Sequence, residues 1–316
     1  MFTLAQIADP HVAPLPQPSI GELSSKRLLG YLSWCVRRKR VHTKEVLDAL
    51  TADLVAAKPD HIAVVGDLTN IALPREFSLA LAWLRRLGNP SVVSVIPGNH
   101  DTYVAEPWDH TLALWDEYMR SDAGIADAGT VADHAPEARY PWVRIRSGIA
   151  IVGVSTAIAT LPFLATGTVG TAQLRRLRDA LLALEKRGLF RVVLIHHPPL
   201  DDLTKRRKRL VDSAAFARVV EEVGAELILH GHTHTATVAW MRGAGAAVPV
   251  VATTSASANG SNEHDLRARY NLFRIERAAD RWEIEMEVRA LEADDRFDVI
   301  ERVSLTDTGA ARESAR

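Results

Sequence analysis

Five short polar motifs in this chain contain residue types that bind metal ions. They are DPH at 9–11, GDLTN at 66–70, GNHD at 98–101, HHPP at 196–199 and GHTH at 231–234. Aspartate, histidine and asparagine side chains suit Mn, Fe or Zn at a catalytic site, whereas a closed structural zinc site usually contains cysteine. The motifs therefore indicate metal-dependent chemistry.

The ligands in these motifs are too many for one ion. Two ions held a few ångströms apart need a carboxylate between them, and Asp67, in the second motif, is the natural bridge. Such a pair of ions lowers the pKa of a bridging water and holds both the attacking and the leaving oxygen of a phosphoryl group. The expected reaction is hydrolysis of an anionic phosphoester by a metal-bridging hydroxide.

Each motif alone also has a purely structural interpretation. A single histidine such as His11 or His232 is more often structural than a ligand, and Asp9 alone could form a turn after a strand. GNHD alone could be a tight turn. Five such motifs, each at the end of a predicted strand, favour one joint metal site. Four histidines outside the motifs are expected to be structural: His42, His61, His110 and His134.

The motifs are positioned by short apolar runs that alternate with amphipathic stretches. The sequence predicts strands at 2–9, 61–67, 91–96, 149–157, 190–197 and 225–234, with helices at 43–57, 74–88, 170–188 and 213–224. The final third is mostly β, with strands at 235–241, 247–255, 270–276 and 281–291. Ligand sites in open α/β sheets lie beyond the carboxyl ends of strands, so the motifs are expected to converge there.

The order of the five motifs, spread from residue 9 to residue 234, resembles the signature of the calcineurin-like metallophosphoesterases. The HHPP and GHTH forms resemble the bacterial branch that contains class III cyclic nucleotide phosphodiesterases. The resemblance implies a four-layer α/β/β/α sandwich, in agreement with the predicted α/β pattern. It also implies a dinuclear phosphodiesterase or pyrophosphatase.

The resemblance further implies a role for each motif residue. One divalent ion (Mn, Fe or Zn) would be held by Asp9, His11, Asp67 and His234, and the other by Asp67, Asn99, His196 and His232. His100 would contact the phosphate and protonate the leaving oxygen. Asp101, the second candidate catalytic residue, would orient His100 or serve the structure of the loop.

Two adjacent histidines end the predicted strand FRVVLIHH. Side chains alternate along a strand, so His196 shares a face with Val192 and Leu194, whereas His197 points the other way. In the family the ligand is typically followed by one variable residue and then by proline or glycine. That pattern favours His196 as the ligand, and His197 would line the pocket or pack beneath it.

A single domain is predicted over 1–300, with an insertion at about 12–42 and a charged tail at 301–316. No linker rich in Pro, Gly or Ser separates two units. The net charge of −1 and the hydrophobic fraction of 47% are ordinary for a soluble globular protein, so any attraction for anions must be local.

The cellular location is predicted from three features. Cys35 is the only cysteine, which excludes an intramolecular disulfide and suits a reducing compartment. The first twelve residues, MFTLAQIADPHV, lack the basic start of a secretory signal. The uncharged run 148–174 contains Pro162 and several glycines, which argue against a membrane span. We therefore expect a cytoplasmic protein, with peripheral membrane contact left open.

Two basic segments depart from a minimal member of the family. Ser25–His42 has no acidic residue and interleaves leucines and Trp34 with Lys26, Arg27, Arg37, Arg38, Lys39 and Arg40. Lys205–Arg209 is a run of five cations. Both segments follow a predicted metal-binding loop and are expected on the rim of the site. They are either ordinary solvated faces or a cationic, partly apolar lip.

A cationic, partly apolar lip would suit a nucleotide- or lipid-linked phosphoester, such as the UDP-diacylglucosamine cleaved by pyrophosphatases of this family. It would also suit peripheral contact with an anionic membrane through 26–40 and 205–209. Nucleic acid is a less favoured partner, because the few aromatic residues form no stacking series. Two alternatives are a cyclic nucleotide phosphodiesterase without membrane contact and a catalytically silent scaffold. The scaffold is disfavoured because such proteins usually lose ligands that this chain keeps.

Overall fold

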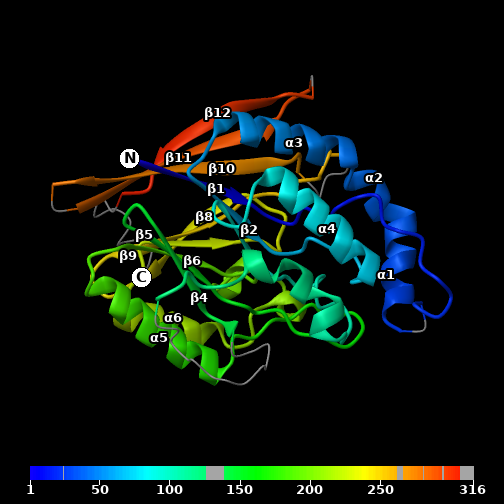
Figure 1. Ribbon diagram of the computed structural model, residues 1–316, viewed down its shortest axis with the longest axis horizontal. Coiled ribbons are helices and arrows are strands. Elements are labelled where there is room, and N and C mark those ends of the chain that lie inside the picture. Colours follow the sequence, from blue (N-terminus) through cyan, green and yellow to red (C-terminus); the bar gives the residue numbers. More distant parts are fainter. Residues whose placement is uncertain (24, 126–138, 262–265, 280, 294, 307–316) are drawn as a thin grey trace.

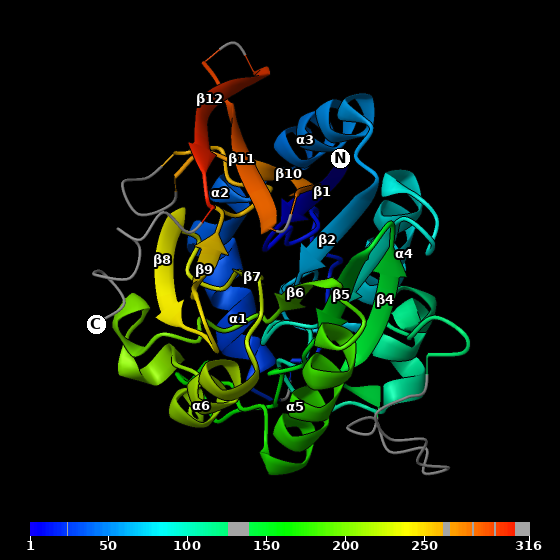
Figure 2. The same cartoon turned by 90° about the vertical axis from the view of Figure 1, so that its left-hand side faces the viewer.

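The computed structural model describes residues 1–316 apart from 24, 126–138, 262–265, 280, 294 and 307–316. Two six-stranded sheets lie face to face in the middle of the molecule, and helices cover their outer faces (Figure 1, Figure 2). The α/β/β/α sandwich that the family resemblance implied is therefore confirmed.

The first sheet contains the beginning and the end of the described chain. Its strands are β1 (Phe2–Ile7), β2 (His61–Val65), β3 (Val93–Ile96), β10 (Arg269–Ala278), β11 (Arg281–Leu291) and β12 (Phe297–Ser304), in the order β12-β11-β10-β1-β2-β3. Strands β1, β2 and β3 run parallel. Their carboxyl ends therefore lie at the same edge of the sheet.

The second sheet is built from the middle of the chain. Its strands are β4 (Trp142–Arg146), β5 (Ile149–Gly153), β6 (Phe190–Leu194), β7 (Leu227–His230), β8 (Thr237–Arg242) and β9 (Ala247–Ala252), in the order β4-β5-β6-β7-β9-β8. The four inner strands are parallel, and the two edge strands β4 and β8 are antiparallel to their neighbours. The inner strands are buried on both faces, which explains their largely apolar sequences.

Two hydrophobic cores hold the layers together. The helices α3 (Lys44–Ala57) and α4 (Pro74–Leu87) flank the first sheet, and α5 (Thr171–Glu185) and α6 (Ser213–Val223) cover the second (Figure 2). Along β6, Val192 and Leu194 belong to the core between the sheets, whereas Val193 belongs to the core under α5 and α6. This alternation agrees with the predicted strand register and sends successive side chains to opposite faces.

The predicted insertion contains a continuous helical stretch: α1 (Arg27–Ser33), a π-helical turn at Trp34–Arg38 and the short α2 (Lys39–Val41). Figure 1 shows α1 and α2 at one end of the sandwich. Arg27 and Trp34 are buried on the inner side, and the Arg27 guanidinium donates to the carbonyl oxygen of Ile71. The insertion is thereby fixed to the loop that follows β2.

Two strands were not predicted from the sequence, and both have weak apolar patterns. Strand β12 is almost entirely exposed and carries charged residues, as is common for an edge strand. Strand β4 is a second edge strand, with two arginines among its five residues. Because β12 runs to Ser304, it passes the expected start of the tail at 301, and the division into a domain and a tail stays a prediction. No helix in the described part of the chain has the length and apolar character needed to cross a bilayer.

Candidate metal centre

The five motifs converge at the carboxyl ends of strands from both sheets. DPH, GDLTN and GNHD follow β1, β2 and β3, whereas HHPP and GHTH follow β6 and β7. All seven predicted metal ligands lie here, six of them buried and the seventh, His234, partly exposed. The fold therefore brings the five motifs together, as the strand ends predicted.

The backbone of these motifs is unusual. Left-handed φ angles between 38° and 71° occur at five of the predicted ligands: Asp9, His11, Asp67, His232 and His234. Residues other than glycine rarely adopt this conformation, and each instance costs on the order of 1–3 kcal/mol. Such strain persists only where the surrounding structure enforces it, and it is typical of functional sites.

One group of predicted ligands centres on His196. Its Nδ1 lies 2.7 Å from the carbonyl oxygen of Val65 and must donate to it, so Nε2 faces the site. That Nε2 is 3.3 Å from Asp67 Oδ2 and 3.3 Å from Asn99 Oδ1. Burial opposes protonation, but the charge of Asp67 raises the pKa of His196 to about 9. The group therefore attracts a positive charge at its centre.

The other group centres on His11. Its Nδ1 donates to the carbonyl oxygen of Thr69 at 2.9 Å, so its Nε2 accepts. This Nε2 lies 3.3 Å from His234 Nε2, which is itself 3.5 Å from Asp9 Oδ1. Burial and then the charge of Arg38 hold the pKa of His11 well below its usual range. His11 is therefore a neutral imidazole with a lone pair directed into the site, as a metal ligand must be.

Asp67 belongs to both groups. Potential ligand atoms within 4.8 Å of one another include the set Asp67, His196 and His232 and the set His11, Asp67 and His100. Although burial disfavours the charged carboxylate, the neighbouring His196 holds the pKa of Asp67 well below its usual range. The His and Asp clusters are consistent with a two-metal site, because buried acceptor atoms converge there around an ionised carboxylate.

His100 lies at the edge of these groups. Its Nδ1 donates to the carbonyl oxygen of Asn70 at 2.6 Å, and its backbone N–H donates to Asp67 Oδ1 at 2.7 Å. Burial and then the charge of Arg38 lower the pKa of His100 to about 3. The ring stacks on Tyr103, with centroids 5.6 Å apart. Its orientation is thus fixed from several sides.

Asp101 makes contacts with the backbone. Its carboxylate accepts from the N–H groups of Thr69 at 2.8 Å and Gly98 at 2.9 Å. It therefore joins the GDLTN loop to the GNHD loop. Burial and then the charge of Asp67 raise the pKa of Asp101 to about 7. These contacts correspond to the structural role that the sequence analysis left open for this carboxylate.

The ring of His197 packs beside that of His232, with centroids 4.4 Å apart, but both of its nitrogens bond to another loop. Its Nε2 donates to the carbonyl oxygen of Ala165 at 3.2 Å, so its Nδ1 accepts from the hydroxyl of Thr156 at 2.7 Å. Both partners belong to the loop after β5. Gly167 of the same loop is so close that an added Cβ would lie 2.3 Å from the His197 ring. The residue ties this loop to the core.

Two residues of the insertion reach the centre, which the sequence did not predict. Arg38, assigned to the rim, places its guanidinium 3.0 Å from His11 Nε2 and 3.2 Å from His100 Nδ1. His42, expected to be structural, forms a further cluster of potential ligands with His11 and His234. Neither residue lies in a motif, and only their place at the end of the basic segment hinted at a role. His61, by contrast, is buried against Ser94, as expected of a structural residue, and His134 lies outside the described residues.

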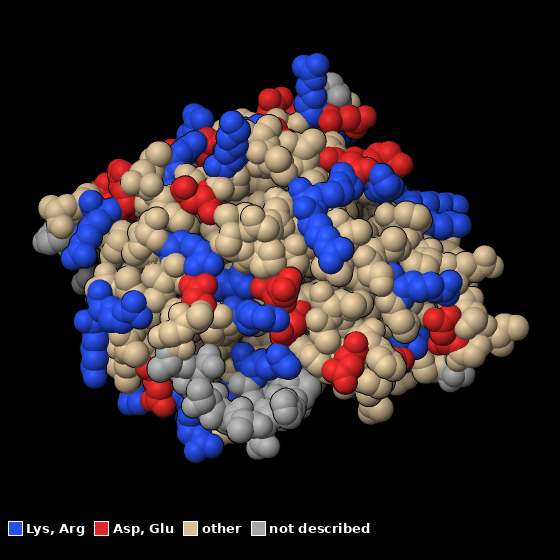
Figure 3. Space-filling model, viewed as in Figure 1, with Lys and Arg blue, Asp and Glu red and all other residues tan. Residues whose placement is uncertain are grey.

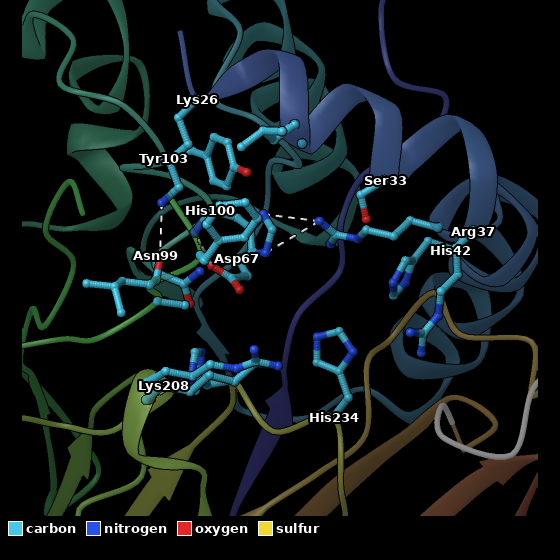
Figure 4. A pocket seen from close by; sticks show the side chains of 18 of the residues that line it. Lys26, Ser33, Arg37, His42, Asp67, Asn99, His100, Tyr103, Lys208 and His234 are labelled. Atoms are coloured by element: carbon cyan, nitrogen blue, oxygen red, sulfur yellow. Dashed lines mark hydrogen bonds between the residues drawn. The ribbon is translucent and has the colours of Figure 1, made fainter. Parts of the chain in front are cut away.

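A cavity of about 490 Å³ opens over the centre (Figure 4). Motif residues line one part of it, including Asp67, Asn99, His100 and His234. The insertion, the loop after β5 and the basic run line the remainder, through Lys26, Leu29, Phe163 and Lys208 among others. The cavity is large enough for a phosphoester with a substantial leaving group.

Comparison with known proteins gives a consistent result. A family model described as calcineurin-like phosphoesterase matches residues 2–236. A dimetal phosphatase from Danio rerio has a similar structure, with a TM-score of 0.61 and 12% identity over 97% of this chain and 99% of that chain. Purple acid phosphatase PPD1 from yellow lupin (Lupinus luteus) gives a TM-score of 0.56 and 12% identity over 96% of this chain and 53% of that chain. No curated protein sequence matches this chain significantly.

The two solved structures, at this low identity, support the common fold alone. The family match is stronger evidence than these structures. It spans the region from β1 to the last histidine motif and so includes all five motifs. Those motifs also meet in space around Asp67. The chain therefore belongs to the calcineurin-like phosphoesterase family.

Proposed function

We propose that this protein is a dinuclear metal-dependent phosphodiesterase or pyrophosphatase. One ion would be held by Asp9, His11, Asp67 and His234, and the other by Asp67, Asn99, His196 and His232. Mn, Fe or Zn suits these nitrogen and oxygen ligands. Bound ions would supply Lewis-acid charge for the phosphoryl oxygens and would lower the pKa of the attacking water.

The observation that carries the proposal is the position of Asp67. Its carboxylate is buried, ionised and within reach of histidines from motifs in both sheets. One oxygen of this carboxylate, Oδ1, accepts from the backbone N–H of His100, whereas the other, Oδ2, faces the histidines. His196 Nε2 lies 3.3 Å from Asp67 Oδ2 and 3.3 Å from Asn99 Oδ1, and both oxygens are acceptors, so a proton or a cation is needed between these three atoms.

The contacts of the two adjacent histidines support His196 as the ligand. His196 directs Nε2 at Asp67, whereas both ring nitrogens of His197 are engaged by the loop after β5. The contacts of Asp101 support a bracing role that holds the GNHD loop in place. His100 would contact the phosphate and protonate the leaving oxygen. Burial and then the charge of Arg38 lower its pKa, and the negative charge of a bound phosphoester would favour the protonated imidazole that this role needs.

Cationic side chains from the insertion and the basic run would bind the substrate anion. Arg38 already lies beside His11 and His100, and its charge contributes to the low pKa of Lys208 across the cavity. Water exclusion around Lys208 is the larger cause of that lowered pKa. A phosphoester between these two cations would relieve their mutual repulsion, so the cavity favours an anionic substrate.

A phosphodiesterase assay on metal-loaded protein tests the proposal. Protein supplemented with Mn should hydrolyse bis(p-nitrophenyl) phosphate, and His100→Ala and Asp67→Asn should each reduce kcat at least about a hundredfold. Thr166→Ala, in the loop after β5, is a control that should keep full activity. Absence of turnover with each of Mn, Fe, Co and Zn would reject the proposal and favour the catalytically silent scaffold.

The finer assignment concerns the substrate. A nucleotide- or lipid-linked phosphoester and a cyclic nucleotide, as for the class III branch, are both compatible with the proposed chemistry. A panel of cyclic AMP, glycerophosphodiesters, UDP-diacylglucosamine and single-stranded DNA separates them by kcat/KM. Preference for cyclic AMP would favour a cytoplasmic enzyme without membrane contact.

A further inference from the structure

The insertion exposes apolar side chains on its outer side. Leu28, Leu32 and Val36 have exposed fractions of 45%, 51% and 73%. The inner side of the same stretch is occupied by buried Arg27, Trp34 and Val41, so packing on the sandwich does not require the outer residues. Large apolar residues left in water over one helical face are typical of a surface that binds a partner.

The loop after β5 adds a second apolar element. Leu161 and Phe163 are exposed by 73% and 79%. Phe163 has a left-handed φ of 66°, which is unfavourable for an aromatic residue, yet its ring lies in water and lines the mouth of the cavity. The loop holds an aromatic side chain outward at an energetic cost, which suggests that the side chain has a use there.

Hydrogen bonds join the apolar elements and the basic run into one rim. Lys26 Nζ donates to Thr160 Oγ1 at 2.9 Å and to the carbonyl oxygen of Leu164 at 3.2 Å. The N–H of Ala165 donates to the carbonyl oxygen of Arg207 at 3.0 Å. We call residues 26–40, 158–165 and 205–209 the rim. The rim surrounds the cavity over the metal centre.

The charge of the rim has one sign over its helical part. No acidic residue occurs between Leu23 and His42, and Arg37, Lys39 and Arg40 are exposed. Figure 3 shows broad uncharged areas, several Lys and Arg side chains and a few Asp and Glu side chains at the end of the molecule where α1 lies. Apolar side chains flanked by cations match the interface of an anionic bilayer, in which the apolar groups enter the acyl boundary and the cations meet the head groups.

We propose that the rim docks on an anionic lipid bilayer and that the substrate is an amphiphilic phosphoester taken from that bilayer. The second part rests on the proposed phosphoesterase function, whereas docking does not. Leu29 and Phe163 both line the cavity, so an acyl or other apolar group can pass from the bilayer along them while the phosphate reaches the metal centre. Arg38 and Lys208, which belong to the two segments expected to contact a membrane, also line the cavity.

Vesicle sedimentation tests docking directly. The unmodified protein should bind phosphatidylglycerol vesicles, and the triple variant Leu32→Ser, Val36→Ser, Leu161→Ser should bind at least about tenfold more weakly. None of these three residues lines the cavity, so hydrolysis of bis(p-nitrophenyl) phosphate should be unchanged. The matched control is Leu79→Ser, Val238→Ser, Ile300→Ser, whose sites are exposed by 40%, 43% and 41% on other elements. The control should bind like the unmodified protein.

A second pair of variants tests the charge. Lys39→Ser with Arg40→Ser should weaken binding to phosphatidylglycerol vesicles about tenfold at low salt and should have less effect at high salt. Lys186→Ser with Arg187→Ser removes an exposed pair after α5, on the other side of the sandwich, and should have no effect. Lack of binding by the unmodified protein, or equal loss in the rim and control variants, would overturn docking.

The substrate class is tested with two chromogenic diesters that differ only in chain length. In vesicles, p-nitrophenyl hexadecyl phosphate should be cleaved with a kcat/KM at least about tenfold above that of p-nitrophenyl methyl phosphate. Phe163→Ser should reduce this preference. Equal rates on both diesters would reject an amphiphilic substrate, whereas no cleavage of either would reject the phosphoesterase function and leave docking to be decided by sedimentation.

Discussion

Two neighbouring histidines show how one residue step along a strand changes the chemistry available to a side chain. His196 and His197 are both fully buried, and their rings are 5.1 Å apart. Because side chains alternate at the end of β6, one ring faces Asp67 and the other faces the loop after β5. Two residues of the same type and equal burial therefore differ in their contacts: one faces Asp67 and the other anchors a loop.

Substitution of each histidine by glutamine should separate these roles. His196→Gln is expected to lose about one equivalent of bound metal, because a ligand of the second ion is removed. His197→Gln should keep its metal but lose the bond from the Thr156 hydroxyl, because glutamine has no acceptor at the position of Nδ1, and stability should fall by about 1–3 kcal/mol. Metal content by mass spectrometry and urea unfolding measure the two effects. Metal loss in His197→Gln with retention in His196→Gln would reverse the assignment.

Gly98 in the GNHD motif lies so close to Asp67 that no side chain fits there. A Cβ added at Gly98 would lie 2.2 Å from Asp67 Oδ1 and 2.5 Å from the Asp67 backbone nitrogen. We expect Gly98→Ala to displace the shared carboxylate and to reduce metal content and activity at least about tenfold. Gly245→Ala is the matched control, since an added Cβ there meets nothing within 4 Å. Normal metal binding by Gly98→Ala would show that the loop can shift without moving Asp67.

The sequence was informative about residues in motifs and uninformative about residues that reach the site from elsewhere. The five motifs could be found because they combine metal-binding residue types with strand ends, which is a local pattern. Arg38 and His42 arrive from the insertion, and their positions depend on how residues 27–41 cross the ends of the sheets. The course of this segment depends on long-range contacts, such as the hydrogen bond from Arg27 to the carbonyl oxygen of Ile71. A local sequence pattern does not predict such contacts.

At the scale of elements, helix α4 supports the GDLTN loop as well as the hydrophobic core. Glu76, in its first turn, is 2% exposed and accepts from the backbone N–H groups of Asn70 at 2.6 Å, Ile71 at 3.1 Å and Leu73 at 2.9 Å. One carboxylate thus begins the helix and shapes the loop that carries Asp67. Burial raises its pKa despite these bonds.

Replacement of Glu76 should therefore affect both stability and the site. Glu76→Gln cannot accept all three backbone N–H groups, and we expect a loss of about 1–3 kcal/mol in the free energy of unfolding. Metal affinity should fall as well, because the GDLTN loop loses its brace. Glu45→Gln in the first turn of α3 is the control, since Glu45 is exposed, and it should change stability by less than about 0.5 kcal/mol. Equal effects of the two variants would contradict the bracing role.

Whether a helix or strand could be predicted from the sequence depended on how its buried side chains are distributed along it. Strand β2 is buried along its whole length and the hydrophobic faces of α4 and α6 are continuous, so their sequences revealed them. The insertion helix has apolar residues on both sides, which hides the helical period. Strand β12 is stabilised by pairing with β11 while its side chains remain in water, so hydrophobicity could not identify it.

At the scale of the whole molecule, the candidate metal centre lies where the two halves of the sandwich meet. Asp9 and Asp67 follow strands of the first sheet, and His196, His232 and His234 follow strands of the second. The N–H of His232 donates to the Asp9 carboxylate, so the halves already meet there. Ions bound by both sets would add bonds between the sheets that the unfolded chain cannot make.

Metal removal should consequently lower the melting temperature of the whole domain. An ion present at a hundred times its Kd stabilises the native state by about 2.7 kcal/mol, and a second ion would add to this. We expect chelation to lower Tm by several degrees and Mn to restore it, as followed by calorimetry. In Asp67→Asn, which loses the shared carboxylate, the same addition of Mn should shift Tm far less. An equal shift in both proteins would mean that Mn acts elsewhere on the molecule, and the two sheets would then be joined by packing and hydrogen bonds alone.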